Sequence, residues 1–146
     1  MFVRRALLAL FGALASAAAT VCSAQAEPLD PARAVMTIRF EPSPYDALES
    51  HAAGYAFVMR KGSVRYVRYA YGGGVVGDQT KPLDESSWRD LLRAAGQDTS
   101  DAHPVCPDFG FFDIKVEQDG TVAAKHRSMC PGTWSAVADS LRGQFS

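Results

Sequence analysis

The chain has 146 residues, of which 47% are hydrophobic and 21% charged, and its 15 Lys and Arg residues are nearly balanced by 16 Asp and Glu residues. This length suits a small protein with one folded domain. The near-neutral charge argues against general nucleic-acid binding, which needs a strongly basic surface.

The first 26 residues have the pattern of a signal peptide. Arg4 and Arg5 precede an apolar run over residues 6–19, and residues 24–26 (AQA) have the small-x-small form of a cleavage site. The run is short for a membrane-spanning helix, which needs about 20 apolar residues. We therefore expect residues 1–26 to be cleaved.

The mature chain would cover residues 27–146 as a single domain. With Arg4 and Arg5 removed, 13 Lys and Arg residues face 16 Asp and Glu residues, a net charge of −3. A second apolar run of spanning length is missing from the sequence, so we expect no stable membrane insertion after cleavage. The predicted location is periplasmic or secreted.

The first element after the signal is a predicted strand over residues 35–40 (VMTIRF). Pro42 and Pro44 follow it, and proline cannot continue a ladder of backbone hydrogen bonds. We expect an edge strand here.

The next element is a hairpin between Tyr55 and Tyr71, with Gly62 in its turn. Two registers fit the pattern, because both faces are apolar: one pairs Phe57 with Tyr66, the other pairs Ala56 with Tyr66. In either register, aromatic and arginine side chains remain on the face that points away from the core.

This hairpin supplies the predicted binding residues, which combine tyrosine with arginine as protein–protein hot spots do. They are Tyr55, Arg65, Arg68, Tyr69 and Tyr71. A structural interpretation competes with this one: the N-terminal segment covers the second face and arginine stems lie over it. The following residues 71–78 (YGGGVVGD) lack the Lys-Ser/Thr of a phosphate-binding loop and predict a mobile hairpin extension.

Two helices are predicted from apolar residues at helical spacing. The first set is Trp88, Leu91, Leu92 and Ala95, and the second is Trp134, Val137, Ala138 and Leu141. Asp84 is placed to cap the first helix and Gly96 to end it, and Pro131 suits the first turn of the second.

A second hairpin lies between Cys106 and Cys130. Alternation over residues 110–117 and 121–127 predicts two strands joined by a three-residue loop, with Val116 opposite Val122. A two-residue loop would place Lys125 against buried Ile114, so we expect the longer one.

That register brings Cys106 and Cys130 together at the open end of the hairpin. Exported proteins form disulfides from such pairs. A bridge closing this loop stabilises a fold by roughly 3 kcal/mol in the chain-entropy model. We predict a structural disulfide.

A metal site is the alternative for the same cysteines. His103, Cys106, His126 and Cys130 have spacings that a zinc site can use, and carboxylates lie nearby in the sequence. Residues 126 and 130 would be about 13 Å apart on a continuous strand, so the chain would have to turn sharply between them. We predict neither catalytic residues nor a cofactor, and no G-x-S-x-G motif is present in the sequence.

Together these elements predict an α+β fold with an antiparallel sheet of about five strands, two helices on one face (two ββα units) and one disulfide. The predicted function is a small, exported, non-catalytic binding module, an inhibitor or immunity-type protein whose partner is an enzyme of the cell envelope. One alternative is a metal-binding or hydrolytic envelope protein that uses His103, His126 and nearby carboxylates. A second is a structural component of the envelope.

Overall fold

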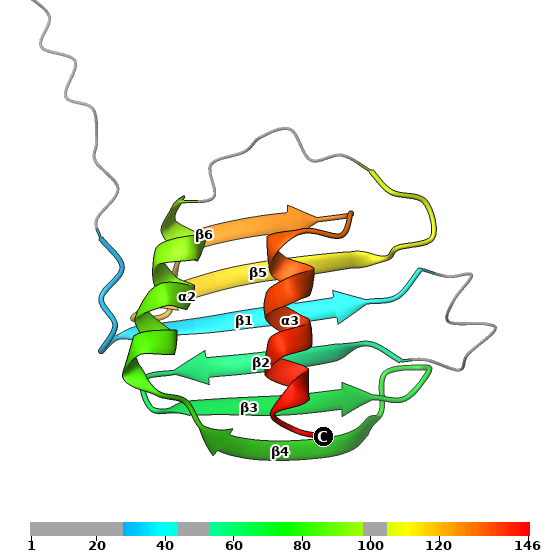
Figure 1. Cartoon of the computed structure of the whole chain (residues 1–146), viewed down its shortest axis with the longest axis horizontal. Coiled ribbons are helices and arrows are strands. Elements are labelled where there is room, and N and C mark those ends of the chain that lie inside the picture. Colours follow the sequence, from blue (N-terminus) through cyan, green and yellow to red (C-terminus); the bar gives the residue numbers. More distant parts are fainter. Residues whose placement is uncertain (1–27, 44–52, 98–104) are drawn as a thin grey trace, which may run out of the picture.

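The computed structural model describes residues 28–43, 53–97 and 105–146. The predicted signal peptide and His103 lie outside these residues. One antiparallel sheet forms the body of the molecule, and both helices lie on the same face of it (Figure 1). The predicted α+β class, the antiparallel sheet and the two helices are confirmed.

The sheet has six strands in the order β4-β3-β2-β1-β5-β6, and every neighbouring pair is antiparallel. The strands are β1 (Ala34–Glu41), β2 (Tyr55–Arg60), β3 (Ser63–Tyr69), β4 (Val75–Pro82), β5 (Phe111–Gln118) and β6 (Thr121–Ser128). The helices are α2 (Glu85–Gln97) and α3 (Thr133–Gly143).

The strand missing from the prediction of five is β4, whose first residues the sequence predicts to be part of a mobile hairpin extension. It pairs with β3 along its whole length: Pro82 lies opposite Ser63 at one end, and Val75 lies opposite Tyr69 at the other. The strand forms an edge of the sheet. Most of its side chains are exposed, so it lacks the apolar alternation of a half-buried strand. Because β4 intervenes between β3 and α2, the prediction of two ββα units is not confirmed.

The predicted edge strand β1 is in fact central, with β2 on one side and β5 on the other. Met36 pairs with Met59 and Val116, and Ile38 pairs with Phe57 and Ile114. Met36 and Ile38 are both fully buried. Pro42 does follow the strand, but it ends β1 without placing it at an edge.

The core lies between the helices and the sheet face that β1 presents through Met36 and Ile38. Trp88 of α2 is fully buried there, and its Nε1 donates a hydrogen bond to the carbonyl oxygen of Pro31 at 2.9 Å. Trp134 of α3 is 5% exposed. The predicted helical spacing therefore places both tryptophans correctly against the sheet.

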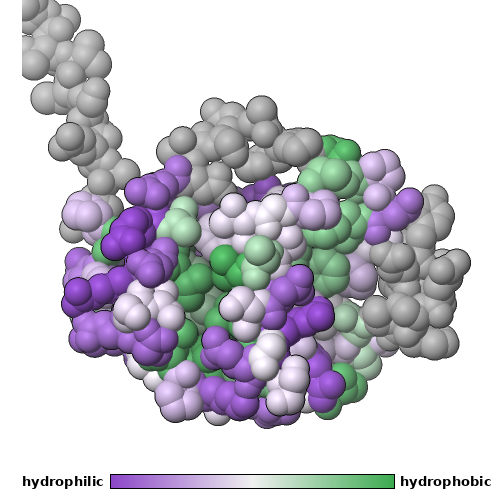
Figure 2. Space-filling view, in the orientation of Figure 1, coloured by the Kyte–Doolittle hydropathy of each residue, from purple (hydrophilic) through white to green (hydrophobic). Residues whose placement is uncertain are grey.

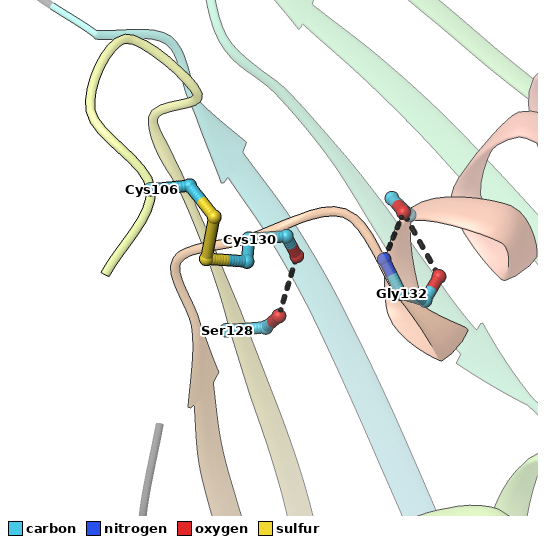
Figure 3. Close-up of a disulfide and its surroundings, with 5 residues drawn as sticks. Cys106, Ser128, Cys130 and Gly132 are labelled. Carbon is cyan, nitrogen blue, oxygen red and sulfur yellow. Dashed lines mark hydrogen bonds between the residues drawn. A yellow bond between two sulfur atoms is a disulfide. The ribbon is translucent and has the colours of Figure 1, made fainter. Parts of the chain in front are cut away.

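The helix N-termini are held by local hydrogen bonds. Asp84 accepts from the backbone N–H of Ser87 at 2.8 Å and from the hydroxyls of Ser86 and Ser87 at 2.6 Å, so the predicted cap is confirmed. Ser135 accepts from the backbone N–H of Gly132 and donates to its carbonyl oxygen (Figure 3). Gly132 precedes α3, which places Pro131 just before the helix and outside its first turn.

The second hairpin differs from its predicted register. Gln118 pairs with Thr121, so the loop has two residues, Asp119 and Gly120, with φ values of 50° and 78°. A turn with positive φ at both positions suits the right-handed twist of a hairpin. The register then shifts between Val116 and Glu117.

That shift sets Val116 opposite Ala124 and Ile114 opposite His126. A two-residue loop alone would have turned Lys125 toward the core, and the extra residue restores the alternation. The prediction of a three-residue loop was wrong because it allowed for no bulge.

The predicted disulfide between Cys106 and Cys130 is confirmed, with 5.0 Å between the two Cα atoms. Figure 3 shows the bridge joining the segment before β5 to the segment that follows β6. The backbone N–H of Cys106 donates to the carbonyl oxygen of Met129 at 3.1 Å, so a hydrogen bond supports the covalent link. The bridge holds the chain beside the end of β6, close to where α3 begins.

Candidate functional site

We call the sheet face opposite the two helices the open face. The strand register defines two rows of side chains that cross it from β4 to β6. The first row is Asp78, Val67, Ala56, Arg39, Asp113 and Arg127. The second row is Thr80, Arg65, Val58, Thr37, Lys115 and Lys125.

Arginine side chains stack on aromatic rings at one end of the open face. The guanidinium carbon of Arg127 lies 4.6 Å from the centre of the Phe111 ring, and that of Arg39 lies 5.7 Å from the centre of the Tyr69 ring. Each arginine is also in an ion pair. We call this group the Arg–aromatic patch; its members are Arg39, Glu41, Tyr69, Phe111, Asp113 and Arg127.

The ion pairs hold the two guanidinium groups in fixed orientations. Arg127 donates to both carboxylate oxygens of Asp113, at 2.7 and 2.9 Å, and this bond raises the pKa of Arg127. Arg39 Nη2 lies 2.9 Å from Glu41 Oε1. The arginine side chains nevertheless remain 55% (Arg39) and 54% (Arg127) exposed, so they are available to a partner.

A small residue on β2 allows Arg39 to reach Tyr69. Arg39 lies on β1 and Tyr69 on β3, so the arginine side chain must cross the intervening strand. The position directly beside Arg39 on β2 is Ala56, which is 3% exposed. The residue beside Tyr69 is Gly54, which immediately precedes β2 and whose carbonyl oxygen accepts a hydrogen bond from the backbone N–H of Tyr69 at 3.0 Å, so neither of these two neighbours of the contact has a long side chain.

The five predicted binding residues do not share one face. Arg65 and Tyr69 lie on the open face, and Tyr71 is 64% exposed in the turn that follows β3. Tyr55 and Arg68 are paired with each other on the helix side of the sheet. The predicted surface is therefore divided between the two faces.

Tyr55 is a core residue. It is 7% exposed, its ring centre lies 5.2 Å from that of Phe40, and the guanidinium carbon of Arg142 lies 5.3 Å from its ring centre. Burial raises the pKa of its hydroxyl. Arg68 lies against Gly77 of β4, where a Cβ atom would come within 2.7 Å of the arginine Nε.

Sequence reasoning missed five members of the Arg–aromatic patch, which are Arg39, Glu41, Phe111, Asp113 and Arg127. Phe111 and Asp113 do alternate with the buried residues of β5, which identifies them as members of the opposite face. The link to Arg39 depends on β1 lying beside β5, whereas the sequence predicts β1 at an edge.

A cavity of about 270 Å³ adjoins the patch at the end of β1 and β3. Arg39 and Glu41 line it together with Tyr69 and the turn residues Tyr71 and Gly72. The patch and this cavity form one continuous candidate surface that includes two of the predicted binding residues.

A second cavity of about 270 Å³ lies between the helices and is lined mainly by apolar side chains. Leu91 and Ala94 contribute from α2, and Val137 and Leu141 from α3. Figure 2 shows the helix side of the molecule, with hydrophobic residues between the hydrophilic outer surfaces of the two helices. None of the predicted binding residues lies in this groove.

The alternative metal site loses two of its four ligands to the disulfide, since both cysteine sulfurs are bonded to each other. His126 Nε2 lies 2.7 Å from the carbonyl oxygen of Ala95, and His103 lies outside the described residues. Within residues 28–43, 53–97 and 105–146, no three His, Cys, Asp or Glu residues are grouped so that they could hold a metal ion. The role of His103 stays a prediction.

Among the helices that the structure describes, none is long and apolar enough to cross a membrane. No protein-family model matches the chain, and no curated protein matches it either.

Proposed function

We propose that the protein is a non-catalytic binding module that recognises another protein of the cell envelope through the open face. In this role it acts as an inhibitor or immunity-type protein, and its target is an envelope enzyme. The observation that supports the proposal is the Arg–aromatic patch, in which two exposed arginines are stacked on aromatic rings.

The composition of the patch is that of a protein–protein hot spot. Tyrosine, phenylalanine and arginine are enriched at such sites, where they present large contact areas and several hydrogen-bond donors. The side chains of the patch project from paired strands. Ion pairs fix Arg39 and Arg127 before a partner arrives, which lowers the entropic cost of binding.

Two features of the chain support the proposed envelope location. The N-terminal 26 residues predict export, and the Cys106–Cys130 bridge is of the kind that forms and persists in oxidising compartments. Both features support a location in the periplasm or outside the cell, and the proposed partner shares that compartment.

Site-specific photo-crosslinking in the native host tests the proposal. Benzoylphenylalanine replaces Phe111, where the probe keeps an aromatic ring, and in a matched strain it replaces Arg89, which is exposed on α2. We expect a crosslinked partner of defined mass from position 111 and none from position 89. Equal crosslinking at both positions, or none at 111, would contradict the proposal.

Purified partner then allows a direct measurement of binding. We expect Tyr69→Ala and Arg127→Ala each to weaken binding by roughly tenfold or more, the usual effect of truncating a hot-spot residue. The control is Arg93→Ala, which removes an exposed arginine from α2. Binding that is unchanged by the two patch substitutions would show that another surface is used.

A further inference from the structure

The strands of the open face carry more cations than carboxylates, although the expected mature chain is acidic. The cations are Arg39, Arg60, Arg65, Lys115, Lys125 and Arg127. The carboxylates are Glu41, Asp78, Asp113 and Glu117. Positive charge is thus concentrated on the face that the Arg–aromatic patch occupies.

All four carboxylates already have a cationic partner on the same face. The pairs are Arg39–Glu41, Arg65–Asp78, Lys115–Glu117 and Arg127–Asp113. In the described part of the chain, Arg60 and Lys125 have no ion pair. These two cations are the surplus that a partner can neutralise.

Two lysines lie directly opposite each other in the second row. Lys115 on β5 is paired with Lys125 on β6, and like charges at such a position destabilise a sheet. Lysine on an edge strand discourages pairing with other sheets, which accounts for Lys125 on β6. It does not account for Lys115, because β5 lies between β1 and β6.

The same row has an uncharged centre. Val58 and Thr37 are half-buried and separate Arg65 on β3 from Lys115 on β5. With strands about 4.8 Å apart, the row extends roughly 19 Å from Arg65 to Lys125. We call Arg65, Val58, Thr37, Lys115 and Lys125 the basic row.

We infer that the basic row recognises an acidic segment of the protein partner. A carboxylate of that segment lies between Lys115 and Lys125, a second pairs with Arg60 near the other end, and an apolar side chain packs on Val58 and Thr37. This inference rests on the proposed function and adds the chemistry of the partner. Carboxylate side chains fit better than a polyphosphate backbone, because the surplus of two cations matches a few separate carboxylates and is too small to neutralise a continuous series of phosphates.

The test measures binding of a fluorescein-labelled peptide of alternating glutamate and leucine by anisotropy, with the protein purified after expression of the full chain. We expect Lys115→Gln and Lys125→Gln each to weaken binding about fivefold, as for a partly exposed charge pair, and to reduce its dependence on salt. The matched control is Lys61→Gln in the β2–β3 turn, which removes the same charge away from the basic row. An equal loss of peptide binding in the control, or no loss of peptide binding in the Lys115→Gln and Lys125→Gln variants, would overturn the inference.

Two further probes distinguish other anionic partners. A single-stranded oligothymidine and vesicles containing phosphatidylglycerol are titrated under the same conditions. We expect both to bind more weakly than the peptide. Tighter binding of either probe, with the same dependence on Lys115 and Lys125, would overturn the inference in favour of nucleic acid or a membrane surface.

Stability provides a readout that is independent of any partner. Because Lys125→Gln removes the repulsion from Lys115, we expect this variant to unfold at a higher urea concentration than the wild type. The inference and the proposed function can fail separately. If crosslinking at position 111 yields a partner that Lys115→Gln and Lys125→Gln bind normally, the inference fails and the function stands; if the peptide binds the row but no partner crosslinks, the function fails.

Discussion

Gly110 lies directly against the backbone of Glu41. A Cβ atom at Gly110 would overlap the carbonyl oxygen of Glu41 and lie 2.9 Å from the Cα atom of Pro42. Gly110 also has a φ of 82°, which side chains rarely tolerate. Gly110 immediately precedes β5, so this contact positions the first residue of β5, Phe111, beside the end of β1.

Gly110→Ala tests that contact, and Gly62→Ala provides a matched control. Gly62 has the same φ of 82°, but a Cβ atom there would meet nothing within 4 Å. We expect Gly62→Ala to lower the free energy of unfolding by about 1 kcal/mol through backbone strain. Gly110→Ala should cost about 3 kcal/mol or more, because the backbone of β1 must also move. Equal losses in urea denaturation would show that the close approach is unimportant.

The Cys106–Cys130 bridge is expected to contribute about 3 kcal/mol to the free energy of unfolding. Reduction with dithiothreitol, or replacement of both cysteines by alanine, should remove this contribution. The measurement is urea denaturation with and without reductant. The double variant is the control, since reductant should not change its unfolding midpoint. Intact mass should show two hydrogens fewer than the reduced chain, and two free thiols in native protein would contradict the bridge.

Asp84 should make the stability of the protein pH-dependent. Hydrogen bonds from Ser86 and Ser87 hold the pKa of Asp84 below its ordinary value. Its stabilising effect is therefore present above the unfolded-state pKa of about 4 and is lost as the pH falls toward the lower pKa of the folded state. We expect Asp84→Ala to unfold at lower urea concentration than the wild type at pH 7, with the difference shrinking below pH 4. A difference that stays constant down to pH 2 would contradict this role.

Ala56 is expected to control the Arg39–Tyr69 contact. Ala56→Leu fills the space that the Arg39 side chain crosses, so it should weaken partner binding by about fivefold, the value of an exposed cation–π contact. Ala136→Leu, which makes the same change at an exposed position on α3, is the control and should leave Arg39 in place. The test is a calorimetric measurement of how tightly each variant binds the purified partner that photo-crosslinking identifies. An Ala56→Leu protein that binds like the wild type would show that the stacking does not contribute.

The helices and the disulfide could be predicted from the sequence because their signals are local or simple. Trp88 and Trp134 begin apolar series at helical spacing, and Asp84 stands where an N-cap residue belongs. Two cysteines follow the predicted signal peptide, and two cysteines allow one intramolecular pairing. Each of these features depends on a few neighbouring residues or on a unique combination, so no knowledge of the sheet was needed.

The order of the strands could not be predicted in the same way. The sequence of β4 is mostly polar, follows three glycines and has no apolar alternation. The segment is a strand because its backbone pairs with that of β3. The register of β5 and β6 depends on a bulge that alternation alone does not reveal. Both errors arise from backbone pairing, which leaves little trace in the choice of side chains.

The candidate surface was predicted only in part, for a related reason. Tyr69 and Tyr71 were identified from the composition of one hairpin. Phe111 and Arg127 belong to the other hairpin, and only the position of β1 between the two brings them to the same face. A surface assembled from both hairpins is visible only when the sheet order is known.

The central position of β1 has a consequence for how the newly made chain matures. Ala34 pairs with Gln118, so the strand synthesised first gains its second neighbour only when most of the polypeptide is complete. In a nascent chain that emerges N-terminus first, the edge of β1 that later pairs with β5 stays unpaired at Met36 and Ile38 until β5 has been synthesised. This delay leaves the half-finished sheet with an exposed edge of the kind that makes folding intermediates prone to aggregation, and a chain truncated after α2 ends with that edge still unpaired.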